Sequence, residues 1–172
     1  MLQSEWLYLE GYLLTDDARV ALIKDVITAS KESGVKVELS TSDPFMAQIF
    51  TGNLRALIGN GVDLVFCIKD GALASIQIGP VDEACDGLKQ SAKTFAVTNG
   101  AQDAIVFNGQ GAVSVPGIPA DVVDTNDAGD MCAGSFIMRR LRTVILKGAE
   151  ALANKSAARV APVWFEDCCV RA

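Results

Sequence analysis

The order of apolar and amphipathic segments is the feature that most constrains the fold of this chain. Short apolar runs of strand length alternate with longer helical patterns, beginning at residues 6–14, 16–33 and 35–39. Strands that alternate with helices in this way form βαβ units, in which the helices cover a sheet of parallel strands. The sequence therefore predicts a layered α/β domain with a mostly parallel sheet.

The clearest helix is expected at residues 16–33. Its first residue, Asp16, is of a type that caps helix N-termini, and Gly34 is of a type that ends helices. Apolar residues recur on one face at helical spacing, namely at Val20, Ile23 and Ile27. The same reasoning predicts further helices at 45–58, 81–93, 127–141 and 145–160, and further strands at 62–67, 94–98, 104–107 and 112–115.

The chain of 172 residues contains no histidine. This excludes a Ser-His-Asp triad, a Cys-His dyad and a histidine-based zinc helix. Any catalysis must use carboxylates, Lys or Arg, thiols, backbone amides or a bound cofactor. The length is sufficient for one ordinary domain with its own core.

The charge balance and the cysteines indicate where such a chain works. The formal net charge of −6 argues against general binding of nucleic acids. The five cysteines are odd in number and lack C-x-x-C spacing, which is typical of a reducing compartment. No apolar run approaches the roughly 20 residues that span a bilayer, and the first residues lack a basic signal region. We expect a soluble, cytoplasmic protein with no membrane and no nucleic-acid partner.

The segment 122–134 carries the strongest indication of chemistry. Small residues open a helix there directly after an extended stretch, so that unpaired N–H groups and the helix dipole favour an anion. Asp130 follows Ala128 and Gly129, where its carboxylate could take a proton from an attacking hydroxyl. One interpretation of this segment is a site that transfers a phosphoryl group to an alcohol. The other interpretation is an ordinary capped helix start.

These residues also resemble a known family. Asp124 to Gly134 is similar to the C-terminal signature of the PfkB-type sugar and nucleoside kinases, the ribokinase-like family, whose pattern is D-T-x-G-A-G-D. The chain further resembles the C-terminal half of adenosine-kinase-like members at 9–13, 42–44, 61–67, 95–98 and 115–117. The resemblance extends over residues 1–160 and implies a three-layer α/β/α fold, while residues 161–172 match no part of the pattern and form a divergent tail.

The resemblance implies a phosphotransferase that moves the γ-phosphoryl group of ATP, with Mg²⁺, to a hydroxyl of a nucleoside or sugar. It places the catalytic base at Asp130 and the anion hole at Asp127, Ala128 and Gly129. It also places nucleotide-binding positions at Thr98, Gly100 and Asn154, and oxygen ligands for a monovalent cation at Asp124 and Asn126.

Several positions depart from the family pattern. Asp127 stands where the signature usually has glycine, and a carboxylate there would repel a phosphate. The Mg²⁺-ordering N-E-x-E motif would fall on 68–71, where its Asn and both Glu are absent, and Asp103 replaces a glycine of a T-x-G-x-x-G stretch. The alternative hypothesis is therefore a catalytically impaired remnant that binds a nucleotide or a protein partner.

The chain is about half as long as the family members that it resembles. The missing N-terminal half of such members carries acceptor-binding residues and strands of the sheet. The strand at 6–14 would then lie near an open edge, where unpaired backbone groups invite association. We expect a homo-oligomer or a partner chain that covers this edge.

Overall fold

The computed structural model describes residues 4–76, 81–142 and 146–162 and divides into two compact units. The first unit contains residues 1–98 with 107–110, and the second contains 99–106 with 111–172. The strands form one sheet whose order follows the chain. They are β1 (Trp6–Glu10), β2 (Lys36–Ser40), β3 (Leu64–Ile68), β4 (Phe95–Asn99), β5 (Asp103–Phe107) and β6 (Ala112–Pro116).

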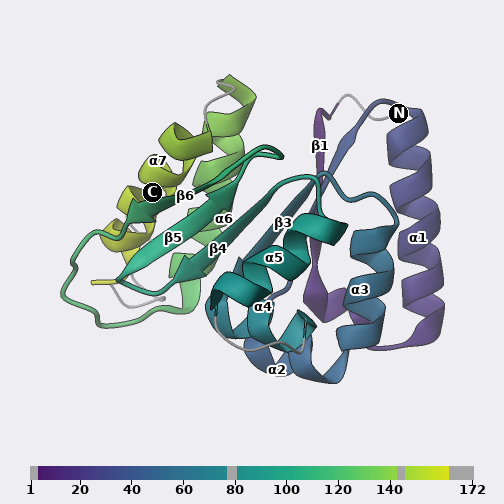
Figure 1. The fold of residues 1–172 in the computed structure, drawn as a ribbon, viewed down its shortest axis with the longest axis horizontal. Coiled ribbons are helices and arrows are strands. Elements are labelled where there is room, and N and C mark those ends of the chain that lie inside the picture. The colour runs from purple at the N-terminus through teal and green to yellow at the C-terminus, as the bar shows by residue number, and fades with distance from the viewer. Residues whose placement is uncertain (1–3, 77–80, 143–145, 163–172) are drawn as a thin grey trace, which may run out of the picture. The chain divides into compact units, whose positions relative to one another are not determined.

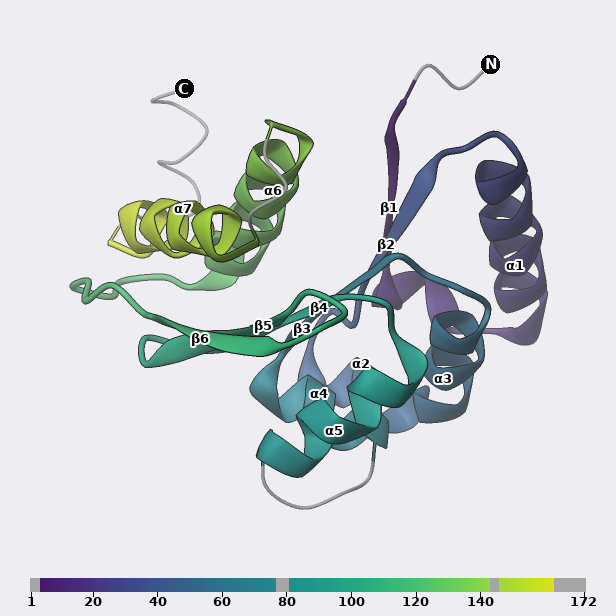
Figure 2. The same ribbon diagram turned by 45° about the horizontal axis from the view of Figure 1, so that its top comes forward.

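In the first unit, β1 to β4 pair in parallel, with Leu9 opposite Leu39, Leu39 opposite Val65, and Val65 opposite Phe95. All four of these side chains are buried. Because the strand order follows the chain and crossovers are right-handed, successive helices fall on the same face of these strands, as Figures 1 and 2 show. The helical elements are η1 (Gly11–Leu14), α1 (Asp17–Glu32), α2 (Pro44–Ile49), α3 (Thr51–Gly59), α4 (Lys69–Ile76) and α5 (Val81–Ser91).

The second unit combines the last strands with two helices, α6 (Asn126–Arg142) and α7 (Leu146–Val160). The connections at 100–102 and 108–111 are too short for a parallel crossover, so β4 to β6 run antiparallel and the sheet is mixed. Helices α6 and α7 pack against each other. Their buried residues include Cys132, Ala133, Phe136, Glu150 and Ala153. The predicted α/β fold with a mostly parallel sheet is confirmed.

Two local predictions were wrong, and one helix was missed. The strand expected at 6–14 ends at Glu10, and η1 begins at Gly11, where a Cβ atom would lie 2.7 Å from the carbonyl oxygen of Thr41. The single helix expected at 45–58 is two helices, because the chain leaves helical geometry at Phe50. Helix α4 was not predicted at all.

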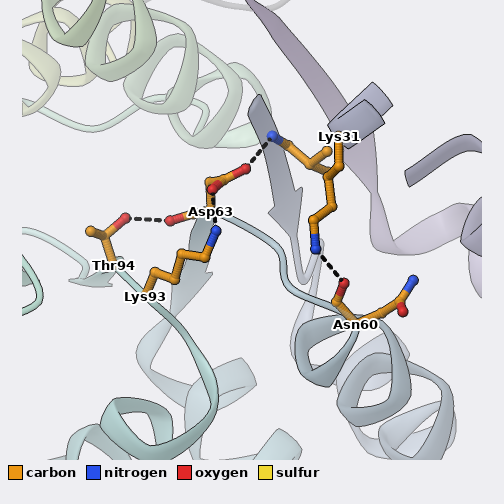
Figure 3. Close-up of polar contacts among 6 residues, drawn as sticks. Lys31, Asn60, Asp63, Lys93 and Thr94 are labelled. Carbon is orange, nitrogen blue, oxygen red and sulfur yellow. Dashed lines mark hydrogen bonds and ion pairs between the residues drawn. The ribbon is translucent and has the colours of Figure 1, made fainter. Parts of the chain in front are cut away.

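Asp63 joins the beginnings of three parallel strands (Figure 3). Its carboxylate accepts hydrogen bonds from the Val37 N–H (3.0 Å) and from Lys93 Nζ (2.7 Å). Its backbone carbonyl accepts one from the Thr94 hydroxyl (2.6 Å). Nearby, Lys31 Nζ donates to the carbonyl of Asn60 at 3.1 Å. This cluster lies at the amino ends of β2, β3 and β4. Parallel α/β sheets bind ligands at the opposite, carboxyl ends of their strands.

Within the described part of the chain, no helix combines the length and the apolar character needed to cross a membrane. The predicted divergent tail begins at residue 161. Residues 163–172, with Cys168 and Cys169, lie outside the described residues.

Candidate functional site

The start of α6 is held in place by the end of α7. Residues 121–125, which have no regular structure, lead into α6. The N–H groups of Val123 and Asp124 both donate to the carbonyl oxygen of Ala161, at 2.8 and 3.0 Å. Ala161 is itself buried. The backbone just before α6 is thus anchored by Ala161, which was predicted to belong to the divergent tail. This role was not predicted, because a main-chain acceptor cannot be recognised from residue type.

Ala128, Gly129 and Asp130 lie in the first turns of α6, as predicted. The Ala128 N–H donates to the carbonyl oxygen of Thr125 at 3.1 Å, so an anion must compete with this bond for that amide. A Cβ atom added at Gly129 would meet nothing within 4 Å, which leaves open space beside the helix start. Asp130 is exposed. An exposed carboxylate next to a helix N-terminus can take a proton from an incoming hydroxyl group.

The other predicted residues around the signature are only partly described. Asn126 and Asp127 belong to the first turn of α6, but their side chains lie outside the described residues. Asp124 is half-buried in the segment before the helix. Among the residues that the structure describes, no group of three or more His, Cys, Asp or Glu side chains is arranged to hold a metal ion. The monovalent cation at Asp124 and Asn126 stays a prediction.

The predicted nucleotide-binding positions fall on strand ends and on α7. Thr98 is half-buried near the end of β4, in the first unit. In the second unit, Gly100 begins the β4–β5 turn with φ of +57°, a conformation that favours glycine. Asn154 lies on α7, where its side-chain amide donates to the carbonyl oxygen of Pro116 at 3.1 Å. This bond fixes α7 to the end of β6, which is a structural role whatever Asn154 binds.

Asp103, which replaces a glycine of the family pattern, is part of a side-chain network. Its Oδ1 accepts a hydrogen bond from Asn99 Nδ2 (3.0 Å), and its Oδ2 accepts one from the Ser114 hydroxyl (2.8 Å). Asn99 also donates to Gln102 Oε1 at 2.8 Å. The carboxylate is therefore committed to joining β4, β5 and β6. The sequence showed the departure at Asp103 but not these partners, which are brought close by the antiparallel strands.

Residues 68–71, where the family motif would fall, form the end of β3 and the first turn of α4. Lys69 is half-buried as the first residue of this helix. Asp70 is exposed in the same turn. A helix N-terminus replaces the pair of glutamates that the family pattern has here.

Two buried carboxyl groups were not singled out from the sequence. Glu38 on β2 and Glu150 on α7 are both 0% exposed, and none of their carboxyl oxygens has a hydrogen-bond partner. Burial raises the pKa of Glu38 to about 8, with a further contribution from the charge of Glu10, and raises the pKa of Glu150 to about 7. The available signal was a glutamate between the apolar residues Val37 and Leu39 in β2, and a glutamate between alanines in α7.

Most of the chain matches the model of a known protein family. The model of the pfkB family carbohydrate kinases matches residues 2–161. The chain belongs to this family. The pfkB assignment covers both units and ends at Ala161, the residue that anchors the segment before α6. Comparison with curated protein sequences gave no match.

The structure of this pfkB chain is similar to solved structures of nucleoside kinases. Adenosine kinase from Sinorhizobium meliloti superposes with a TM-score of 0.87 and 28% identity, over 94% of this chain and 50% of that chain. Adenosine kinase from Trypanosoma brucei brucei gives 0.83 and 20% identity, over 92% and 52%. Aminoimidazole riboside kinase from Salmonella enterica gives 0.81 and 20% identity, over 94% and 58%. The last two show the fold alone. This pfkB chain spans about half the length of these relatives.

Proposed function

We propose that this chain contributes the phosphoryl-transfer half of a kinase that moves the γ-phosphoryl group of ATP to a hydroxyl of a nucleoside, such as adenosine, or of a sugar. The observation that carries the proposal is the start of α6, where Asp130 is exposed one turn into a helix within a chain of the pfkB family. Support for the donor comes from two relatives. The riboside kinase was solved with an ATP analogue, and a chain described as a ribokinase II from Escherichia coli was solved with ATP and Mg²⁺.

In this proposal the chain's own groups have distinct tasks. Asp130 accepts the proton of the acceptor hydroxyl, and the N–H groups at Asp127, Ala128 and Gly129 stabilise negative charge on the transferred group. The positions that we propose for nucleotide contacts are Thr98 in the first unit and Gly100 and Asn154 in the second. Mg²⁺, when bound, would neutralise phosphate charge, and it would be held mainly through phosphate oxygens and water.

Replacement of Asp130 by asparagine tests the proposal. Asparagine keeps the size and polarity of the side chain but cannot accept the proton, so we expect ATP turnover with a panel of nucleosides and sugars to fall by about 10² or more. Asp121, which is exposed before α6, is the matched control, and Asp121→Asn should leave turnover unchanged. Turnover that survives Asp130→Asn would remove this residue from the catalytic role.

A second candidate is a remnant of the same fold that binds a nucleotide without turning it over. Residues 68–71 favour it, because they form a helix start and carry none of the Asn and Glu side chains of the family motif. Titration calorimetry with ATP and Mg²⁺ separates the two functions. Micromolar binding without turnover supports the remnant, whereas turnover with any acceptor of the panel excludes it.

A further inference from the structure

Strand β6 is an edge strand within the described part of the chain. It comes last in the sheet order and pairs with β5 (Figures 1 and 2). After β6 the described chain continues through α6 and α7 to residue 162, and no strand in this stretch lies beside β6. One side of β6 therefore faces β5, and its other side is available to a further strand.

A hydrogen bond at the end of β6 shows which of its backbone groups point outward. The Gly117 N–H donates to the carbonyl oxygen of Gln102 at 2.9 Å, so Gly117 directs its backbone groups toward β5. Backbone groups alternate in direction along a strand, and therefore every second residue before Gly117 also faces β5. Residues 112, 114 and 116 direct their backbone groups away from β5.

Pro116 agrees with this alternation in two ways. Proline has no N–H, and edge strands accept it where that group would face away from the neighbouring strand. The carbonyl oxygen of Pro116 accepts a hydrogen bond from Asn154 Nδ2 of α7, at 3.1 Å. The groups left for an added strand are the N–H and C=O of Ala112 and Ser114, to which the described residues give no partner.

The side chains along this edge carry no charge. Residues 108–120 contain no Asp, Glu, Lys or Arg, in a chain with a formal net charge of −6. Val113 and Val115 lie on the same face of the strand, but Val113 is 41% exposed and Val115 is 3% exposed. Ala112 and Ser114 are also exposed. An exposed edge that lacks charges is open to pairing with another strand.

We propose that β6 pairs with β6 of a second copy of this chain, antiparallel and about a twofold axis at Val113. In this register Ala112 lies opposite Ser114 of the second copy, and Ser114 lies opposite its Ala112. Each of these pairs exchanges two main-chain hydrogen bonds. The two Val113 side chains meet across the axis, where the Cα atoms of such a pair are about 4.5 Å apart. The inference concerns assembly and does not depend on phosphoryl transfer.

A second copy fits this edge better than a different polypeptide. The outward residues lie symmetrically on either side of Val113, so a twofold axis places each donor opposite a matching acceptor. Charged groups give an interface its choice of a different partner, and residues 108–120 offer none. Two copies of this uncharged strand bring no like charges together. Because Pro116 ends the pairing after a short stretch, we expect a weak and reversible dimer.

Sedimentation equilibrium of the full chain over a concentration series tests this pairing and should show a reversible dimer. Val113→Lys places two ammonium groups opposite each other at the axis, so the dissociation constant should rise by about tenfold or more. The matched control is Val122→Lys. Val122 is 59% exposed in the irregular segment before α6, and its replacement should leave the dissociation constant unchanged. Circular dichroism establishes that both variants are folded.

A charge swap tests the position of the axis. Val113→Glu alone should weaken the dimer as Val113→Lys does, whereas a mixture of the two variants should associate at least as tightly as the wild type, because opposite charges then meet. Ala112→Pro removes one outward N–H and should weaken the dimer, while Ala112→Thr keeps this group and should not.

Three results would overturn the proposal. The first is a chain that stays monomeric over the whole concentration series, which would leave the edge to a different polypeptide. The second is a dimer that Val113→Lys leaves intact, or a charge-swapped mixture that does not associate. The third is a dimer that forms only after removal of residues 163–172, which would assign the edge of β6 to this segment of the same chain.

Discussion

Glu38 is a completely buried acidic residue between Val37 and Leu39 in β2, and it makes the stability of the fold depend on pH. In the folded chain its pKa is raised to about 8 by burial, whereas in the unfolded chain it ionises near pH 4.5. Between these values the folded state holds a proton that the unfolded state has lost. Stability is therefore greatest at low pH within this window and falls as pH rises toward 8.

Replacement of Glu38 by glutamine tests this dependence. Each pKa unit corresponds to about 1.4 kcal/mol, so we expect the wild-type free energy of unfolding to fall by a few kcal/mol from pH 5 to pH 8. Glu38→Gln has no proton to lose, and its denaturant unfolding should be flatter over that range. Glu32→Gln, at an exposed position on α1, is the control and should keep the wild-type slope. Identical slopes for all three proteins would contradict the buried acid.

Glu150 allows a second prediction at the residue scale. It is buried on α7, and its charge acts on the buried Cys132 thiol of α6, whose pKa is raised mainly by burial. Glu150→Leu removes an unpartnered carboxyl group from this helix pair, and urea unfolding should show a gain of about 1–3 kcal/mol at pH 8 and a smaller gain at pH 5. Ala151→Leu, on the exposed side of α7, should change stability by only a few tenths of a kcal/mol. Destabilisation by Glu150→Leu would indicate a polar partner.

At the scale of elements, Asp63 holds the beginnings of β2, β3 and β4 together. Asp63→Ala leaves the Val37 N–H without its acceptor, and we expect a loss of about 1–3 kcal/mol in chemical denaturation. Asp63→Asn keeps an acceptor oxygen and loses only the ion pair with Lys93, whose side chain is 61% exposed, so its cost should stay below about 1 kcal/mol. Equal losses in the two variants would show that the ion pair, and not the main-chain contact, stabilises this end.

Local signals predicted those elements whose ends are defined by the residues themselves. Asp16 accepts from the Arg19 N–H at 2.9 Å at the start of α1, and Asp43 accepts from the Met46 N–H at 2.9 Å at the start of α2. The break at Phe50 was not predicted, because the apolar period continues through it. The Thr51 hydroxyl donates to the carbonyl of Ala47 at 2.7 Å at that break. From the sequence, a threonine that makes such a bond at a helix break cannot be distinguished from a threonine inside a continuous helix.

For the whole molecule, the family signature predicted the position of Asp130 on a helix start and the half-length match to known kinases. The sequence did not reveal how the surroundings of the signature are built. Asp103 is held by Asn99 and Ser114, and Ala161 accepts two N–H groups before α6. The Asp103 contacts depend on the antiparallel pairing of β4 to β6, and the Ala161 contacts are made by a main-chain acceptor far along the chain from the two N–H groups. Residue types alone therefore predict where the signature helix begins better than they predict the contacts that hold its surroundings.

The half-length match leads to the last prediction. If the chain provides the phosphoryl-transfer half of a kinase, its turnover of ATP should be limited by the absence of the acceptor-binding half. The probe is the part of the S. meliloti adenosine kinase chain outside the matched 50%, produced as a separate polypeptide. Co-purification of the two chains should raise ATP turnover with adenosine by about tenfold or more, because a bound and oriented acceptor lowers the barrier.

The control for this complementation is the same complex with Asp130→Asn in this chain. It should assemble equally well and remain inactive, because the added polypeptide restores the acceptor site but not the base. An active complex with the asparagine variant would place the base on the added polypeptide. A stable complex without turnover, in which calorimetry still detects binding of ATP, would favour the remnant function, since the acceptor half would then be present and the phosphoryl group would still not move.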